Sequence, residues 1–316
     1  MSNKITRRTF IKGSAAFTIL TPSLTSGVSR IFESSENPDL PSQNIDVAVT
    51  IGSNYFESTK KAIDILGGMS KFVPKNSSVL LLGNVWNVPG TFTKPDIFRA
   101  IARMCWEARA KNVTCVSMMP VRNWEMTGNA TVLKKEGVVL RLFDFEDYSQ
   151  YKRVPIPNGR LLKEVEIMNE FFNHDVFINV PICKHHVDTV FSCTMKNLMG
   201  LNSYRNNRKF HIDEDGRAIS TAEHLGQCIA DLNTVIVPTL NVIDATEFIA
   251  TNGPMGPGKI VKPRKIVAGV DRLALDAYCI ALLDKNINDV VKIQKGYEQG
   301  LGVIDLSKVR VVEEKR

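Results

Sequence analysis

The stretch Asp175-Val-Phe-Ile-Asn-Val-Pro-Ile-Cys-Lys-His-His186 decides the fold class. Residues 175–180 form a short, strongly apolar run, which is typical of a strand that is buried on both faces of a parallel sheet. Lys184, His185 and His186 close the stretch. In open α/β sheets the ligand crevice lies beyond the carboxyl ends of the strands. The stretch therefore predicts a buried strand with a candidate site at its end.

Short β-type runs alternate with amphipathic helical runs on both sides of this stretch. Before it we expect strands at 46–51, 78–82, 113–118, 138–143 and 151–156, and helices at 55–66, 94–110, 130–136 and 163–172. After it we expect helices at 221–235, 273–284 and 288–299, and strands at 240–244, 265–270 and 308–312. This alternation predicts a Rossmann-like α/β fold, with a mostly parallel sheet and helices on both of its faces.

The composition is that of an ordinary globular protein. The chain has 316 residues, of which 44% are hydrophobic and 23% charged, and this excludes disordered, collagen-like and coiled-coil proteins. Its net charge of +7 raises the question of a polyanionic partner. Four of the basic residues lie within residues 1–29, so the rest of the chain carries only about +3. No basic stripe with interleaved aromatic residues is present, and we do not expect nucleic-acid binding.

The N-terminal segment resembles an export signal. The sequence Thr6-Arg-Arg-Thr-Phe-Ile-Lys12 matches the twin-arginine motif, and a mildly apolar run at 13–24 follows it. That run is too short and too rich in Ser, Thr and Gly to span a bilayer, so no stable membrane span is expected. Residues 1–29 are therefore predicted to be a signal segment that directs the protein to the twin-arginine translocase and on to the periplasm. The alternative is a chance arginine pair in a disordered tail.

The composition along the chain also predicts its domain organisation. Residues 30–44 are polar and contain Pro38 and Pro41, which is typical of a linker. Residues 45–316 are predicted to form a single α/β domain. A subdivision near residue 150 is the alternative.

Four side chains around the central stretch are candidates for catalysis. Lys184 and His186 share one face of an extended chain, because successive side chains alternate between faces. A helix from about residue 188 would place Lys196, Asn197 and Gly200 on one face, where Lys and Asn can meet an anionic ligand and Gly permits close approach. We expect Lys184, His186, Lys196 and Asn197 to be catalytic and Gly200 to contact a cofactor. A solvated helix face is the alternative.

A glycine- and proline-rich loop at 253–258 is a second candidate binding element. Backbone N–H groups near Gly253 and Gly258, together with Lys259, could cradle a phosphate or a carboxylate. The loop lacks a Gly-Lys-Ser/Thr sequence that leads into a helix, so nucleotide hydrolysis is not expected. A plain wide turn is the alternative.

Two histidines and two aspartates are candidate metal ligands. His224 and Asp231 lie two turns apart on one predicted helix, and Asp244 ends a predicted strand. With His186 they could ligate a divalent metal or serve as acid and base. A surface position for His224 is the alternative. The six cysteines include no Cys-x-x-Cys pair, so we expect no iron–sulfur cluster from this chain.

Two further aspartates are candidates for structural roles. Asp271 is well placed to cap a helix. Asp276 falls on an apolar helix face, where a carboxylate must be paired or hydrogen-bonded. It either anchors the ammonium group of Lys184 or Lys196, or braces a loop.

In order and spacing, these residues resemble domain-of-unknown-function family 362. The matching motifs are Ile178-Asn-Val-Pro181, Lys184, His186, Thr194-x-Lys-Asn-x-x-Gly200, His224, Asp231, Asp244, Asn252-Gly-Pro254, Gly258, Ala268-Gly-x-Asp271, Ala274-x-Asp-Ala277 and Gly300-Leu-Gly302. The likeness runs from about residue 75 to the end and adds Asn252 to the expected cofactor-binding residues. It implies a Rossmann-like architecture and no established reaction.

The chain departs from that family in two ways. It has Leu82-Gly-Asn84 where the family tends to have Lys-Pro-Asn, and it lacks the Cys-rich ferredoxin-like segment of many relatives. Neither a Gly-x-Gly-x-x-Gly nor a Gly-x-Ser-x-Gly motif marks it as a dinucleotide dehydrogenase or an α/β-hydrolase. We therefore expect an exported, metal- or cofactor-dependent enzyme that acts on a small anionic ligand. The alternative is a non-catalytic periplasmic binding or maturation factor for an oxidoreductase partner.

Overall fold

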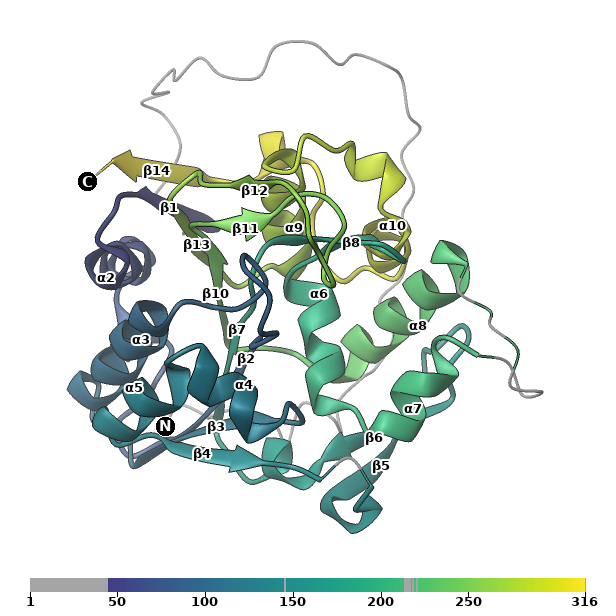
Figure 1. The fold of residues 1–316 in the computed structure, drawn as a ribbon, viewed down its shortest axis with the longest axis horizontal. Helices are drawn as coiled ribbons and strands as arrows, with labels where there is room; N and C mark the ends of the chain where they lie inside the picture. The colour runs from purple at the N-terminus through teal and green to yellow at the C-terminus, as the bar shows by residue number, and fades with distance from the viewer. Residues whose placement is uncertain (1–44, 145, 213–216, 218, 220, 316) are drawn as a thin grey trace, which may run out of the picture. The chain divides into compact units, whose positions relative to one another are not determined.

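An eight-stranded sheet forms the centre of the computed structural model, which describes residues 45–315 except 145, 213–216, 218 and 220 (Figure 1). Its strand order is β14 (Val311–Lys315), β1 (Val47–Ile51), β13 (Lys265–Gly269), β10 (Leu240–Ala245), β7 (Val176–Val180), β2 (Ser78–Gly83), β3 (Asn112–Ser117) and β4 (Val139–Leu142). Strand β13 runs antiparallel to both of its neighbours, and the other neighbouring pairs are parallel. The predicted mostly parallel sheet is confirmed.

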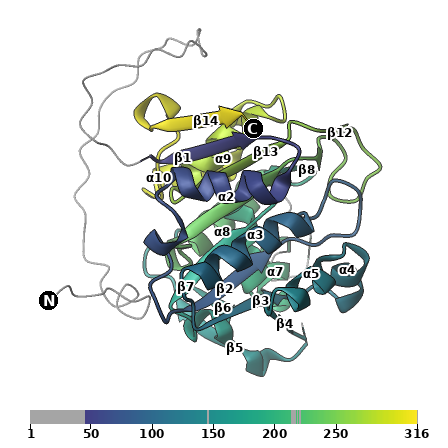
Figure 2. The same cartoon turned by 90° about the vertical axis from the view of Figure 1, so that its left-hand side faces the viewer.

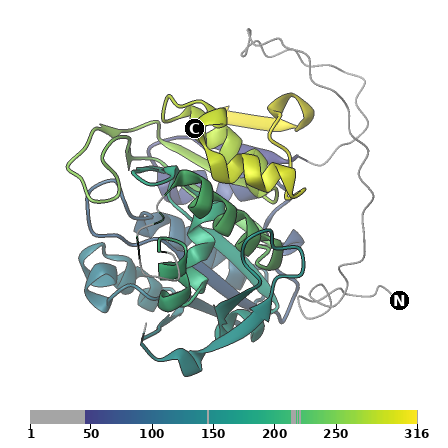
Figure 3. The same cartoon turned by 90° about the vertical axis from the view of Figure 1, so that its right-hand side faces the viewer.

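Helices cover both faces of this sheet. On one face lie α2 (Tyr55–Ile65), α3 (Pro95–Glu107), α4 (Val121–Met126) and α5 (Asn129–Lys135), which Figure 2 shows toward the viewer. On the other lie α6 (Thr194–Asn197), α7 (Tyr204–Lys209), α8 (Ala222–Val235), α9 (Arg272–Ala281) and α10 (Val291–Glu298), which Figure 3 shows. The Rossmann-like α/β class is therefore confirmed.

The alternation of side chains along each strand divides the core into two halves. In β2, Val79 and Leu81 pack on the α3 side, whereas Leu80 and Leu82 pack on the α8 side. Both sets are apolar because both faces of the sheet are covered. In β7 the alternation places Asn179 on the α8 side, where its side-chain N–H groups donate to the carbonyl oxygen of Thr194 and to Asn241 Oδ1. A buried polar side chain of this kind requires such partners.

The helix predicted at 163–172 is wrong. Residues Glu164–Met168 form strand β6, which pairs antiparallel with β5 (Tyr151–Pro155), and only a 3-10 turn at Asn169–Phe172 follows. Val165 and Ile167 are buried on the core side. The composition of this segment favours a helix, but its pairing with β5 and the burial of its side chains make it a strand.

The helix expected from about residue 188 is also shorter than predicted. Strands β8 (Lys184–His186) and β9 (Val190–Ser192) form a hairpin, and α6 begins only at Thr194. A 3-10 turn at Leu198–Leu201 extends it. The short strands β11 (Phe248–Ile249) and β12 (Ile260–Val261) pair beside the loop that joins them. The β8–β9 hairpin forms one wall of the pocket that is described in the next subsection.

Residues Ile45–Arg316 group into one compact unit. The predicted signal segment at 1–29 and the predicted linker at 30–44 lie outside the described residues. Within the described part of the chain, no helix has the length and apolar character that a membrane crossing requires.

Candidate functional site

A pocket of about 320 Å³ opens at the carboxyl ends of β7, β2 and β3. These three strands are parallel neighbours, so their carboxyl ends meet at the same edge of the sheet. We call it the lysine pocket. Its lining residues are Leu82, Gly83, Asn84, Val85, Trp86, Ser117, Met118, Met119, Lys184, His186, Ser192, Lys196, Asn197, Met199, Gly200, Asn207 and Pro254. The four side chains expected to be catalytic, and Gly200, all line it.

Lys184 begins strand β8 and is almost fully buried, with 2% of its surface exposed. Its Nζ donates to Asn84 Oδ1 at 2.8 Å and to the carbonyl oxygen of Thr91 at 3.0 Å. Burial, together with the nearby charge of Lys196, lowers the pKa of Lys184 to about 7. The amine therefore exchanges between its charged and neutral forms close to neutral pH.

Lys196 comes from α6 and is partly exposed to the pocket. Burial lowers the pKa of Lys196 to about 8, although the carboxylate of Asp188 opposes this. Among the described residues, neither Lys184 nor Lys196 forms an ion pair with a carboxylate. Two ammonium groups without direct counter-charges favour an anion in the pocket.

His186 lies on the same side of β8 as Lys184. Burial and the charges of Lys196 and Lys184 lower the pKa of His186 to about 2, so its imidazole is neutral. Its Nδ1 accepts from the backbone N–H of Asp188 at 3.3 Å, which places the ring hydrogen on Nε2. His185 lies on the opposite side, where its Nδ1 accepts from the backbone N–H of Gly253. Lys184 and His186 thus share a face, as the alternation predicts.

A chain of asparagine amides fixes the floor of the pocket. Asn84 Nδ2 donates to Asn197 Oδ1 at 3.0 Å, and Asn197 Nδ2 donates to Asn179 Oδ1 at 2.8 Å. Asn179 Nδ2 in turn donates to Asn241 Oδ1 at 3.0 Å. These bonds leave the oxygen of Asn84 directed at Lys184. Asn197 thus fixes the orientation of the Asn84 amide.

Sequence reasoning did not select Asn84 or Asn179 for the site. Asn84 follows β2 directly, so the rule that sites lie at carboxyl ends of strands could have found it. Asn179 lies inside a strand, and its signals in the sequence were an amide within an apolar run and its place in the motif Ile178-Asn-Val-Pro181.

Asp276 holds the start of α6. Its carboxylate accepts from the backbone N–H groups of Thr194, at 2.8 Å, and Met195, at 3.2 Å, and also from the Thr194 hydroxyl. Burial raises the pKa of Asp276. Of its two predicted roles, the bracing role is confirmed. Because Lys196 lies one residue beyond Met195, these bonds also hold its backbone in place. Asp271 caps α9, as predicted, by accepting from Leu273 and Ala274.

The four candidate metal ligands do not come together. Asp244 accepts from the backbone N–H groups of Lys94 and Thr246 and from the Thr246 hydroxyl. His224 lines a separate pocket of about 710 Å³ and lies 3.3 Å from the carbonyl oxygen of Lys209. Within the described ranges, no group of three or more His, Cys, Asp or Glu side chains is placed to hold a metal ion. All six cysteines are buried free thiols.

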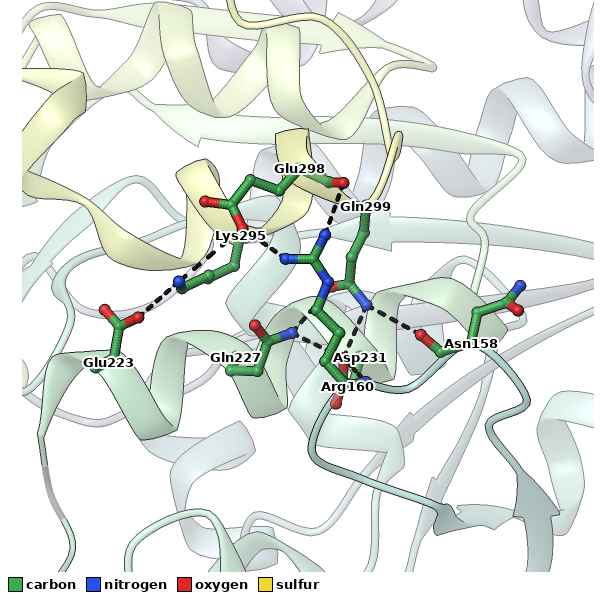
Figure 4. Close-up of polar contacts among 8 residues, drawn as sticks. All are labelled: Asn158, Arg160, Glu223, Gln227, Asp231, Lys295, Glu298 and Gln299. Carbon is green, nitrogen blue, oxygen red and sulfur yellow. Dashed lines mark hydrogen bonds and ion pairs between the residues drawn. The ribbon is translucent and has the colours of Figure 1, made fainter. Parts of the chain in front are cut away.

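Asp231 is enclosed by hydrogen-bond donors (Figure 4). It accepts from the backbone N–H groups of Arg160, Leu161 and Leu162 and from the side-chain amides of Gln227 and Gln299. The carboxylate ties the loop before β6 to helix α8 and to the end of α10. Its two oxygens accept all five of these hydrogen bonds, and Asp231 is not among the residues that line the lysine pocket.

The loop at 252–259 meets the lysine pocket through Pro254. The N–H of Gly253 bonds to His185, and the side chain of Asn252 donates to the carbonyl oxygen of Pro257. Gly253 and Gly258 are required for close approach, because a Cβ would lie 2.2 Å from the His185 carbonyl oxygen and 1.9 Å from that of Thr251, respectively. Lys259 is exposed. Of the predicted cofactor-binding residues, Gly200 lines the lysine pocket, whereas Asn252, Gly253, Gly258 and Lys259 do not.

Fold and pocket together define an α/β protein with a lysine-lined site at the strand ends. A family model described as "Domain of unknown function (DUF362)" matches residues 79–281, which is more than half of the chain. The chain belongs to this family. No curated protein matches it.

Two solved structures are similar in fold. The lactate racemase apoprotein from Thermoanaerobacterium thermosaccharolyticum is 15% identical, with a TM-score of 0.48 over 77% of this chain and 58% of that chain. A structural-genomics target from Thermotoga maritima is also 15% identical, with a TM-score of 0.42 over 60% of this chain and 50% of that chain. The chain thus spans between a half and three fifths of the length of these two structures.

Proposed function

We propose that this chain binds a small carboxylate- or phosphate-bearing ligand in the lysine pocket and exchanges a proton with it through Lys184. The observation that supports this most strongly is the pair Lys184 and Lys196, which line one pocket without a carboxylate partner among the described residues. An anionic ligand would supply the missing counter-charge. Hydrogen bonds to charged groups are also stronger than those between neutral groups.

Each side chain has a separate part in this proposal. Lys196 holds the anion, because its Nζ is free of hydrogen bonds to the described residues and its pKa of about 8 keeps it mostly charged near neutral pH. Lys184, with a pKa of about 7, matches the requirement of a general acid or base at that pH. His186 presents a neutral ring with its hydrogen on Nε2. Asn84 orients the Lys184 amine. Binding without any reaction, as in a maturation factor, is the alternative.

The affinity of the pocket for an anion is expected to fall as the pH rises. Below the pKa of about 7 for Lys184 and about 8 for Lys196, both groups are charged, and above these values the attraction is lost. Sulfate is a suitable probe because its own charge is constant over this range. Calorimetric titration should show at least a tenfold weaker affinity at about pH 9 than at about pH 6. An affinity that is flat or rises with pH would refute the binding role of the lysines.

We infer that the chain is exported by the twin-arginine route, on the basis of the motif at 6–12. A double substitution, Arg7→Lys with Arg8→Lys, keeps the charge and removes the arginine pair. The exported fraction, measured by cell fractionation and immunoblotting, should then fall close to zero, whereas Lys4→Arg should have no effect. Unchanged export of the double variant would show that the pair is not read as a signal.

A further inference from the structure

The lining of the lysine pocket is divided between charged and apolar side chains. Lys184, His186 and Lys196 come from the β8 hairpin and α6, which follow β7. Trp86, which follows β2, and Met118 and Met119, which follow β3, supply large apolar surfaces. The charged side chains therefore follow β7, whereas Trp86, Met118 and Met119 follow β2 and β3. Met199, which is buried, is an apolar lining residue on the charged side.

The strand order sets the distance between the two halves. The order is β7, β2, β3, and neighbouring strands lie about 4.8 Å apart, so the ends of β7 and β3 are separated by about 10 Å. The residues after β7 carry the positive charge, and the residues after β3 are apolar. The amine of Lys184 already reaches across β2 to Asn84, so a ligand held there has to span about one strand spacing to reach the side chains that follow β3.

The size of the pocket favours a ligand larger than a simple oxyanion. A water molecule has a share of about 30 Å³ in the liquid, and an oxyanion is equivalent to only a few waters. The pocket of about 320 Å³ would remain largely empty around such an ion. Its volume instead lies at the lower end of the range for sites that bind organic molecules, which are mostly lined by apolar side chains with a few polar groups.

The apolar side chains suit a flat or flexible hydrocarbon group. Trp86 and Met119 are only partly buried, so each exposes apolar surface inside the pocket. Covering such surface is favourable. Methionine adapts to irregular shapes and contacts aromatic rings through its sulfur, and tryptophan offers a broad face.

We propose that the ligand is an amphipathic acid, with one anionic group on Lys184 and Lys196 and an aromatic or aliphatic body against Trp86, Met118 and Met119. This rests on the proposed function, because the anionic end is the ligand group assumed there. The lysines supply attraction for any anion of suitable size. The apolar half selects among anions.

Two sulfonates test the apolar half separately from the charged half. Benzenesulfonate and methanesulfonate carry the same ionised group and differ in the ring. Isothermal titration should give benzenesulfonate an affinity at least about tenfold higher than that of methanesulfonate, because the ring buries apolar surface. Met119→Gln and Trp86→Ala should each remove most of this difference and leave the affinity for methanesulfonate nearly unchanged. Two variants are used so that one poorly folded protein does not decide the test.

The outcomes separate the two proposals. Equal affinities of the wild-type protein for the two sulfonates would overturn the amphipathic ligand and leave anion binding intact. A tenfold preference that survives both variants would also overturn it, since the ring would then bind elsewhere. Failure of both sulfonates, and of sulfate, to bind would refute the proposed function itself.

Discussion

Replacing Asp231 with alanine is expected to lower the free energy of unfolding by about 3–5 kcal/mol. Asp231 is fully buried and accepts five hydrogen bonds, three of them from backbone N–H groups of the loop at 160–162. The substitution leaves these donors inside the protein without an acceptor, and each unsatisfied group costs about 1–3 kcal/mol unless water replaces the carboxylate. Urea unfolding followed by circular dichroism measures the loss.

Two matched variants show whether this effect belongs to Asp231 itself. Figure 4 shows Glu223 in the same region, where it pairs with Lys295 at 2.6 Å, but Glu223 is mostly exposed. Glu223→Ala should therefore cost far less than Asp231→Ala, because exposed ion pairs contribute little. Asp231→Asn keeps one oxygen acceptor and should fall between the two. Normal stability of Asp231→Ala, combined with a loss of anion binding, would mean that Asp231 contributes to ligand binding and not to stability.

Replacing Lys196 with methionine is expected to weaken the binding of sulfate by roughly 10- to 100-fold at neutral pH. The variant keeps the length of the side chain and removes its charge, and a hydrogen bond to a charged group contributes about 1.5–3 kcal/mol. The pKa of Lys184 should rise at the same time, since the charge of Lys196 lowers it in the wild-type protein. Calorimetry gives the affinity, and the pH profile of binding gives the pKa.

Two controls accompany Lys196→Met, one at the same position and one at Lys259. Lys196→Arg retains the charge and should retain most of the affinity. Lys259→Met removes an exposed charge from the loop at 252–259, which meets the pocket only through Pro254 in the described structure, and should change little. A comparable loss in Lys259→Met would mean that this loop takes part in binding, as the sequence-based cofactor hypothesis had it.

The alternation of strands and helices was visible in the sequence because both faces of the sheet are covered. Runs such as that of β2 are apolar on both faces, and amphipathic helices such as α3 lie between them. The helix predicted at 163–172 was wrong because most of this segment is a strand that pairs with β5, and its composition does not show this pairing. Pairing between hairpin strands depends on tertiary context, which one local window does not contain.

The candidate site was predictable only where its residues are close in sequence. Lys184, His186 and Lys196 follow one strand, and local periodicity placed them on common faces. Trp86 and Met118 join them because β2 and β3 lie beside β7, and the sequence does not specify this strand order. The prediction of Asp231 as a metal ligand left out the backbone N–H groups that bond to it, because they come from a loop about 70 residues earlier.

Titration of individual lysines tests anion binding in the lysine pocket without a change of side chain in the protein that is measured. Protein labelled with ¹³C at the lysine ε carbons is followed by NMR across the pH range, with Lys184→Met and Lys196→Met to assign the signals. Lys184 should titrate at about pH 7 and Lys196 at about pH 8, and saturating sulfate should move both values upward, since a bound anion favours the charged amine. Burial also lowers the pKa of Lys292 to about 7, so a third signal is expected in this range. Ordinary titration of Lys184 and Lys196 at about pH 10.4, with no response to sulfate, would show that the two lysines form no anion site.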